Sequence, residues 1–234
     1  MTSSVITSQS RRRWRMPGGR PASVSRDELE RIAFDLFARR GFSETTVDMV
    51  ADEAGVARRT FFRYFHSKND VVWGSFDEHL DKLRARLASV PARTALAEAL
   101  RVCIVEFNQV PPAELRRHRK RMQLILTVPE LQADSALRYS AWKDVVAEFA
   151  GARLGEPSGS LRPQVVARCA LGAAIAAYEH WLASPGSALT SALDEALRFC
   201  LSGFAGAERE ATRRSRTAAP AGARGRREGR GPAG

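Results

Sequence analysis

The most constraining stretch of this chain is residues 45–65, TTVDMVADEAGVARRTFFRYF, in which Gly55 separates two short helical patterns. Each pattern has apolar residues on one side, and a glycine permits a tight turn where a side chain would collide with the preceding helix. The inward positions are Val47, Val50, Ala54, Val56, Phe61 and Phe65. This arrangement predicts a helix-turn-helix, a unit that places its second helix in the major groove of DNA.

The rest of the chain also has helical periodicity, and no run of residues alternates as a strand would, so the sequence predicts an all-α fold. Ser25 with Glu28 forms a capping box before the first helix, and Gly41 follows its end. Proline and glycine mark most of the later breaks. We expect helices at 26–40, from 45 or 46 to 54, and at 58–65, 68–90, 94–109, 112–127, 129–154, 161–183 and 187–203.

Charge is distributed unevenly along the chain. The net charge is +11, of which residues 1–24 and residues 204–234 carry +5 each, so the middle is nearly neutral. We expect both ends to be disordered and basic, and such tails favour loose, salt-sensitive attraction to nucleic acid. One alternative is therefore a non-specific DNA-coating protein that acts through its tails, whose binding would fade uniformly as salt rises.

Within the predicted helix-turn-helix, positive charge is concentrated at one place. Residues 25–68 contain eight basic and eight acidic side chains, whereas residues 57–68 contain Arg58, Arg59, Arg63 and Lys68 with no acid. Arginine can donate two hydrogen bonds to a guanine edge, and tyrosine, threonine and lysine can hold phosphates. A solvated basic face is the simpler interpretation of a charge run alone. Combined with the helix-turn-helix pattern, it predicts sequence-specific DNA recognition.

These residues resemble the N-terminal DNA-binding domain of the TetR family of regulators. The likeness is carried by Ile32–Gly41, Phe42, Thr45–Val47, Ala51, Ala54–Val56, Thr60, Tyr64–Phe65 and Ser67–Lys68. The resemblance implies that Thr46, Tyr64 and Lys68 hold phosphates. It places the groove-facing side at Arg58, Arg59, Thr60, Phe62 and Arg63. Ala57 departs from the usual Ser or Thr helix cap, and Phe62 stands where Tyr is common.

A narrower likeness covers Arg58–Asp77, which resembles regulators associated with mycofactocin redox-cofactor gene clusters. Departures from that pattern occur at His66, Val72 and Ser75. The family resemblance implies a repressor that is released from a palindromic operator by a small effector. The narrower one implies control of mycofactocin-type redox or lipid-related genes. The expected domains are then 25–73 for DNA binding and 74–203 for ligand binding and dimerisation.

The second domain is expected to hold a ligand pocket and a homodimer interface. The pocket candidates are Phe107, Met122, Ile125, Leu126, Trp142, Val146 and Phe149, although residues at such helical spacing are often core fillers. The interface candidates are Leu171, Tyr178, Trp181, Leu193 and Leu197. The run Arg116–Arg121 (RRHRKR) is by default a solvated face. Because it adjoins an apolar helix, it also suggests a phosphate-bearing effector such as an acyl-coenzyme A.

Other classes of function find little support. The longest apolar run, Cys169–Ala177, is shorter than the roughly 20 residues of a membrane span, so we expect a cytoplasmic, nucleoid-associated protein without membrane contact. The three cysteines have no paired spacing, and we expect them to be reduced and packed as small hydrophobes. No metal-ligand pair, nucleophile elbow or phosphate-cradling loop is found. The sequence therefore predicts neither an enzyme nor a bound metal or cofactor.

Overall fold

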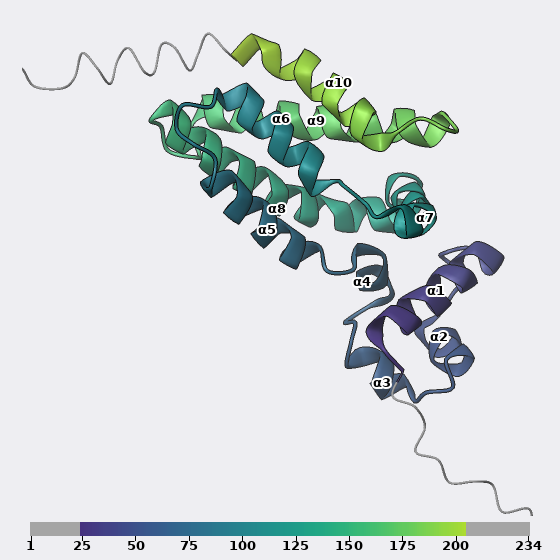
Figure 1. Ribbon diagram of the computed structural model, residues 1–234. Coiled ribbons are helices and arrows are strands. Elements are labelled where there is room, and N and C mark those ends of the chain that lie inside the picture. The colour runs from purple at the N-terminus through teal and green to yellow at the C-terminus, as the bar shows by residue number, and fades with distance from the viewer. Residues whose placement is uncertain (1–23, 205–234) are drawn as a thin grey trace, which may run out of the picture.

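The computed structural model describes residues 24–204, which form helices and no strand (Figure 1). The basic segments expected to be disordered, residues 1–24 and 204–234, lie outside this range except at 24 and 204. The α-helices are α1 Arg26–Arg40, α2 Val47–Glu53, α3 Arg58–Phe62, α4 Lys68–Trp73, α5 Phe76–Ala88, α6 Leu96–Phe107, α7 Leu115–Thr127, α8 Pro129–Leu154, α9 Leu161–Ala183 and α10 Leu189–Leu201. Two short 3-10 helices complete the list: η1 Pro112–Glu114 precedes α7, and η2 Ser202–Phe204 follows α10.

Local capping explains why α1 begins and ends where the sequence predicts. The Ser25 hydroxyl accepts a hydrogen bond from the Glu28 backbone N–H at 3.1 Å, satisfying one of the free donors of the first turn. At the other end Gly41 has φ 87°, and its N–H donates to the Phe37 carbonyl at 2.9 Å. The limits of α8 and α9 also match the expected ones.

The single helix expected over residues 68–90 is wrong, because the structure divides it into α4 and α5. Gly74 lies between them with φ 60°, a conformation that residues with a Cβ rarely adopt. Its N–H ends α4 by donating to the Asp70 carbonyl at 2.9 Å. Periodicity alone missed this break, since the apolar stripe continues on both sides of the glycine.

The N-terminal helices share one core that continues into the second half of the chain. Phe34, Phe37, Phe61 and Phe65 pack together, with Phe61 fully buried. The α4 residues Val71, Val72 and Trp73 join this cluster, as do Ile125 of α7 and Leu131 of α8. Packed side chains of α4, α7 and α8 therefore connect the helix-turn-helix with the second half of the chain.

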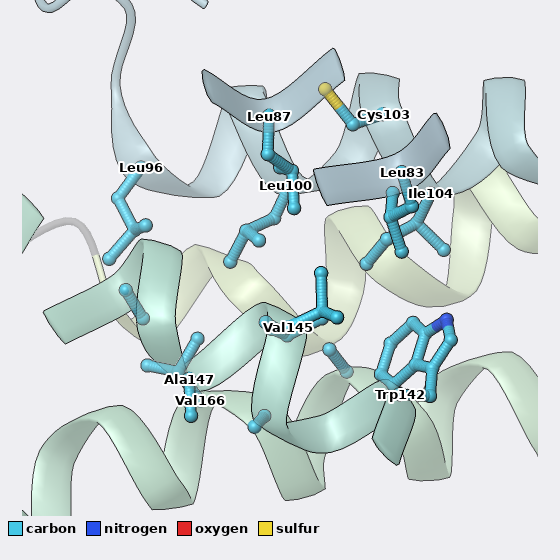
Figure 2. Packing of buried hydrophobic residues seen from close by; sticks show 14 of the residues in the cluster. Leu83, Leu87, Leu96, Leu100, Cys103, Ile104, Trp142, Val145, Ala147 and Val166 are labelled. Carbon is cyan, nitrogen blue, oxygen red and sulfur yellow. The ribbon is translucent and has the colours of Figure 1, made fainter. Parts of the chain in front are cut away.

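The remaining helices form a bundle in which α9 lies between α8 and α10 and α5 packs on α6 and α8 (Figure 1). Leucines of α5 and α6 meet Trp142, Val145 and Ala147 of α8 in its core (Figure 2). Cys103 is buried in the same core, and all three cysteines are free thiols, as expected. The bundle is therefore held by apolar side chains rather than by covalent links.

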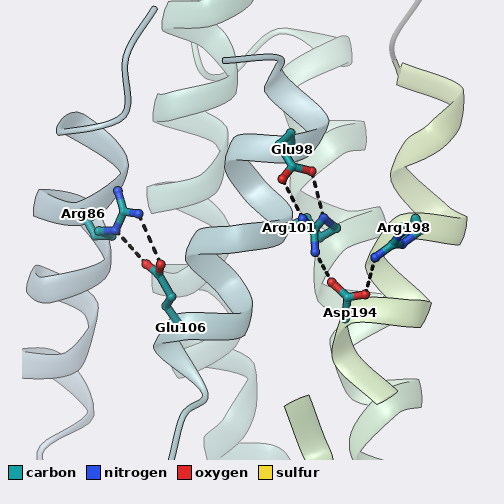
Figure 3. A network of polar contacts seen from close by, with 6 residues as sticks. All are labelled: Arg86, Glu98, Arg101, Glu106, Asp194 and Arg198. Carbon is teal, nitrogen blue, oxygen red and sulfur yellow. Dashed lines mark hydrogen bonds and ion pairs between the residues drawn. The ribbon is translucent and has the colours of Figure 1, made fainter. Parts of the chain in front are cut away.

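Ion pairs on the outside of the bundle join neighbouring helices (Figure 3). Arg86 of α5 pairs with Glu106 of α6 at 2.7 Å, and Arg101 of α6 pairs with both Glu98 and Asp194. Asp194 of α10 also receives Arg198 at 2.5 Å. Partly solvated pairs of this kind contribute about 0–1 kcal/mol each, so they adjust the packing of α10 rather than create it. Within residues 24–204, none of the helices has the length and apolar character to cross a membrane.

Candidate nucleic-acid interface and ligand cavity

The second and third helices form the turn that the sequence predicts. Gly55 has φ 66°, and its N–H donates to the Asp52 carbonyl at 3.0 Å. On α3, Phe61 points into the core, whereas Phe62 is 41% exposed and Arg58, Arg59 and Arg63 are exposed. The buried side of α3 thus fixes its orientation, and its cationic side remains accessible to a partner.

The arginines of α3 differ in their surroundings. Arg58 pairs with Asp48 of α2 at 2.8 Å and lies over the Phe62 ring at 5.4 Å. Arg63 stacks on Tyr64, with its guanidinium 4.7 Å from the ring centre. Among the described residues, the Arg59 guanidinium has no hydrogen-bond or ion-pair partner. Arg59 is therefore the side chain of α3 that can be given to a ligand without breaking an existing contact.

Helix caps also differ between α2 and α3. The Thr46 hydroxyl caps α2 by accepting from the Met49 N–H at 3.2 Å. Ala57 precedes α3 with extended backbone and makes no side-chain cap, because alanine has no hydrogen-bonding group. The first turn of α3 consequently keeps free N–H donors that a phosphate or water can satisfy.

Tyr64 and Lys68, the expected phosphate holders, both make contacts within the unit. The Tyr64 hydroxyl donates to the Val24 carbonyl at 3.0 Å and accepts from Arg63 at 2.9 Å. The Lys68 ammonium donates to the Phe42 carbonyl at 2.8 Å and lies 4.2 Å from the Phe42 ring centre. Burial lowers the pKa of Lys68, while Glu130 and Glu44 act in the opposite direction. Tyr64 thus ties the turn after α3 to the residue before the cap of α1, and Lys68 ties the start of α4 to the loop after α1.

A cavity of about 240 Å³ lies where α4 and α5 meet the α6–α7 connection, α7, α8 and α9. Five of the seven expected pocket residues line it, namely Phe107, Met122, Ile125, Leu126 and Trp142. Val146 and Phe149 do not line it. Val146 is fully buried in the bundle core, and Phe149 packs beside that core under the guanidinium of Arg153 at 5.4 Å. One turn along α8 is enough to change the neighbour from cavity to core.

Sequence reasoning missed the aromatic wall of the cavity. Trp73, Phe76 and Tyr139 are in edge contact, with ring centres 5.2 Å and 6.0 Å from that of Trp73. The Trp73 Nε1 donor is buried and has no hydrogen-bond partner among the described residues. Trp73 ends α4 and Phe76 begins α5, on either side of the break at Gly74 that the sequence did not predict.

The basic run on α7 is not a solvated face. Of Arg116–Arg121, only Arg116 is exposed. Arg117, His118 and Arg121 line the cavity, and Arg119 packs over Trp181 at 4.3 Å while donating to the carbonyls of Trp181 and Leu182. Spacing of four residues between Arg117 and Arg121 was the signal that could have shown a shared face. The cavity consequently has apolar walls and one cationic side.

A chain of hydrogen bonds crosses the cavity wall. The Asn108 amide donates to the Ile104 carbonyl at 2.7 Å, which directs its oxygen to the Tyr178 hydroxyl, also at 2.7 Å. The single hydroxyl proton of Tyr178 is thereby used, so His118 donates from Nε2 to the Tyr178 oxygen at 3.0 Å. Burial, reinforced by Arg121 and His79, lowers the pKa of His118 to about 4. His118 is therefore neutral at pH 7, and its Nδ1 is left as an acceptor.

Glu30 of α1 connects the cationic side of the cavity to the helix-turn-helix. Its side chain is 10% exposed, and it pairs with Arg121 and with Arg117, the latter at 3.7 Å. Arg121 also lies over the Phe34 ring at 5.4 Å. Burial lowers the pKa of Arg121, whereas Glu30 raises it. The two arginines thus serve both the cavity and α1.

The expected interface anchors occupy the interior of the chain. Trp181, Leu193 and Leu197 are at most 1% exposed, Tyr178 is buried beside them, and Leu171 packs against the bundle core. Buried side chains cannot contact a partner without rearrangement. The exposed apolar or small residues of α9 and α10 include Leu161, Val165, Gly172, Ala176 and Phe199, with Phe199 87% exposed.

The helix-turn-helix presents the exposed cationic side of α3, and the neighbouring helices enclose a cavity. These two features together define a one-component DNA-binding regulator. Residues 31–72 match the family described as bacterial regulatory proteins, tetR family, and residues 94–205 match the MftR C-terminal domain. The chain belongs to the TetR family of bacterial transcriptional regulators. Its members are regulators rather than enzymes, and they bind operator DNA as dimers and small molecules as effectors.

Similar proteins refine this assignment. A Mycobacterium tuberculosis protein described as a mycofactocin biosynthesis transcriptional regulator, MftR, is 44% identical over 178 residues, which are 76% of this chain and 90% of that protein. The narrower likeness seen at Arg58–Asp77 is thereby confirmed. Thermus thermophilus FadR, solved in complex with lauroyl-CoA, is 25% identical with a TM-score of 0.50, covering 77% of this chain and 95% of that one.

The fold class is confirmed by a further solved structure. The fatty acid degradation regulator FadR from Bacillus halodurans has a TM-score of 0.56 and 19% identity, covering 76% of this chain and 95% of that chain. At this identity the likeness establishes the fold, an N-terminal helix-turn-helix followed by a helical domain.

Proposed function

We propose that this regulator is a repressor that binds a palindromic operator as a homodimer and leaves it when an amphipathic, acyl-CoA-like effector fills the α4–α9 cavity. The observation that carries the proposal is the position of the cavity, whose Trp73 and Phe76 walls continue directly into α4. A ligand there touches the helix that joins the two halves. We place the boundary between those halves at residues 73 and 74.

The operator side of the proposal rests on α3. Arg58, Arg59, Thr60, Phe62 and Arg63 are assigned to base edges, and Arg59 is the one whose guanidinium is free among the described residues. Thr46, Tyr64 and Lys68 are assigned to phosphates. For Tyr64 and Lys68 this role is added to their contacts with Val24 and Phe42, which hold them in place before DNA arrives.

Dimerisation is assigned to the exposed side of α9 and α10. Gly172 and Ala176 lie on α9 with small side chains that allow close approach of a second helix, and Phe199 of α10 is a large apolar group left in solvent. Two copies joined here would present two recognition helices to successive turns of DNA. This surface replaces the buried residues expected from the sequence.

The ligand side rests on the chemistry of the cavity walls. Aromatic and aliphatic side chains suit an acyl chain, and Arg117 and Arg121 suit a negative or strongly polar head. The volume of about 240 Å³ accommodates a chain but not a whole coenzyme, so the nucleotide part would lie outside the cavity. The lauroyl-CoA complex of Thermus thermophilus FadR supports this class of effector.

The genes under control are inferred from similarity. The relative described as a mycofactocin biosynthesis regulator, and the match to the MftR C-terminal domain, favour mycofactocin-type redox genes as targets. Sequencing genomic DNA that co-purifies with the protein tests this inference. Recovered fragments that cluster beside such genes would support it, and fragments spread evenly over the genome would contradict it.

An in vitro experiment tests the regulator itself. Duplexes selected from a random pool by the purified protein are expected to be palindromic and to compete effectively against bulk DNA. Lauroyl-CoA is then titrated into the complex, with free coenzyme A as the matched control. Release by lauroyl-CoA alone is the predicted result, and retention of the complex at saturating lauroyl-CoA would contradict the acyl-CoA assignment.

A further inference from the structure

The ion pairs of Glu30 span the contact between α1 and α7. Glu30 lies 91 residues before Arg121 in the chain, yet both side chains are largely buried and in direct contact. Arg117 approaches the same carboxylate and also pairs with Glu114 at 3.5 Å. Glu30 is thus the internal counter-ion of two arginines that line the cavity.

Arg121 is placed where three parts of the molecule meet. Besides Glu30 and the cavity, its guanidinium lies beside Gly74, where an added Cβ would be 3.5 Å from Nη2. Its Nε donor is buried without a partner among the described residues, as is Nε1 of Trp73 in the same cavity wall. Both residues line the cavity, so a ligand that brings acceptor oxygens would satisfy these donors once the two side chains turn toward it.

We propose that Glu30 competes with the anionic group of a cavity ligand for Arg117 and Arg121, so that an apolar molecule with a negative head draws both arginines away from α1. Glu30 would then be buried without its partners, which is costly, and α1 must move to hydrate it. Since α1 carries Phe34 and Phe37 of the helix-turn-helix core, this movement reaches α3. The inference rests on the proposed function only in taking this cavity as the effector site.

The test uses two fluorescent probes that differ in one group. Anilinonaphthalene sulfonate has an apolar body and a negative charge, and N-phenylnaphthylamine has the same body without the sulfonate. In Glu30→Gln the internal competitor is neutral, so we expect the sulfonate to bind about tenfold more tightly, while affinity for the uncharged probe changes less than about twofold. Asp35→Asn removes one charge from the exposed side of α1 and is the matched control, expected to leave both affinities unchanged.

A second variant covers the case in which Glu30→Gln is poorly folded. Glu30→Gln with Arg121→Gln removes both charges of the pair, and its preference for the sulfonate over the uncharged probe is expected to fall below that of the wild type. Hydrogen exchange supplies an independent reading in the wild type. The sulfonate should speed amide exchange in residues 26–40, and the uncharged probe should not.

Equal responses of the two probes to Glu30→Gln, or no response of either, would overturn the proposal. So would faster exchange of α1 with both probes. If the probes behave as predicted but lauroyl-CoA does not release DNA, the proposed function fails and the role of Glu30 stands. The two ideas are therefore separated by the same set of proteins.

Discussion

Helices α3 and α7 both carry clustered arginines and use them in opposite ways. On α3, Arg58, Arg59 and Arg63 are exposed, and nothing in the described part of the chain holds the Arg59 guanidinium. On α7, Arg117 and Arg121 are partly buried against a carboxylate from another helix. A cation in water is available to phosphates and base edges, whereas a cation in a cavity selects what enters it.

The difference shows that neighbours, not local charge, decide the role of a basic run. The apolar side of α3 packs within the helix-turn-helix itself, because Phe61 and the following Phe65 lie in its core. The α7 run packs against α1 on one side and Trp181 on another, which partly buries Arg117, Arg119 and Arg121. Substitutions that leave no unpaired charge at Glu30 should therefore affect one of the two functions and leave the other intact.

The largest effect on stability is expected at His118 of α7, because its imidazole is largely buried. With its pKa at about 4 in the folded chain and 6.5 as the ordinary value, the unfolded chain takes up this proton first as pH falls. The contribution of neutral His118 to stability is therefore complete above pH 6.5 and is lost between pH 6.5 and about 4, a change of roughly 3 kcal/mol. Urea unfolding at several pH values should show that the free energy of unfolding depends less steeply on pH in His118→Gln than in the wild type. If the slope of the unfolding free energy against pH is unchanged in the variant, the imidazole of His118 is solvated rather than buried.

Arg59→Ala tests the exposed side of the comparison. We expect preference at one operator base position to fall by about 1–3 kcal/mol, because a guanidinium that bonds a base edge is removed. Tyr64→Phe and Lys68→Met should instead weaken binding to all sequences alike. Selection of random duplexes by each variant measures this. If Arg59→Ala recovers the wild-type motif unchanged, Arg59 does not read bases.

Gly74→Ala tests the joint between the two regions. A residue with a Cβ at φ 60° is disfavoured, and the loss of stability is expected to be about 1–2 kcal/mol. Thermal unfolding measures it, with Gly159→Ala as the control, since Gly159 is an exposed glycine without a positive φ and with open space around it. Equal destabilisation by both substitutions would show that the backbone at residue 74 is unstrained.

The smallest effect is expected at the start of α3. Ala57→Ser supplies the missing cap and should stabilise the chain by about 0.5–1 kcal/mol. The measurement is the free energy of unfolding from chemical denaturation, compared between proteins whose unfolding free energy falls equally steeply with denaturant. A loss of stability would mean that the serine hydroxyl does not reach the free N–H groups of the first turn.

The helix-turn-helix could be predicted from the sequence because its determinants are local. Ser25, Gly41 and Gly55 act within a few residues of their own position, and the structure places them as expected. Phe61 is buried and Phe62 exposed, as the phase of α3 requires. Such features depend on the chain immediately around them, which one sequence contains.

The cavity was only partly predictable because its parts come from distant segments. Leu126 and Trp142 were found as apolar residues at helical spacing, but Val146 has the same spacing and faces the core. The pairing of Glu30 with Arg121 depends on how α7 crosses α1, and the burial of Tyr178 and Trp181 depends on α10. These are properties of tertiary packing that local periodicity does not contain.

The central claim is that the arginines of α3 serve DNA and those of α7 serve the ligand. One measurement tests it directly: fluorescence anisotropy of a selected operator duplex with Arg59→Ala and with the double variant Glu30→Gln/Arg121→Gln, each with and without lauroyl-CoA. Arg59→Ala should lose discrimination against bulk DNA while lauroyl-CoA still releases what is bound. The double variant, which leaves no unpaired charge at residue 30, should bind the operator but no longer respond to lauroyl-CoA. If either variant loses both properties while remaining folded, the division between the two helices is contradicted.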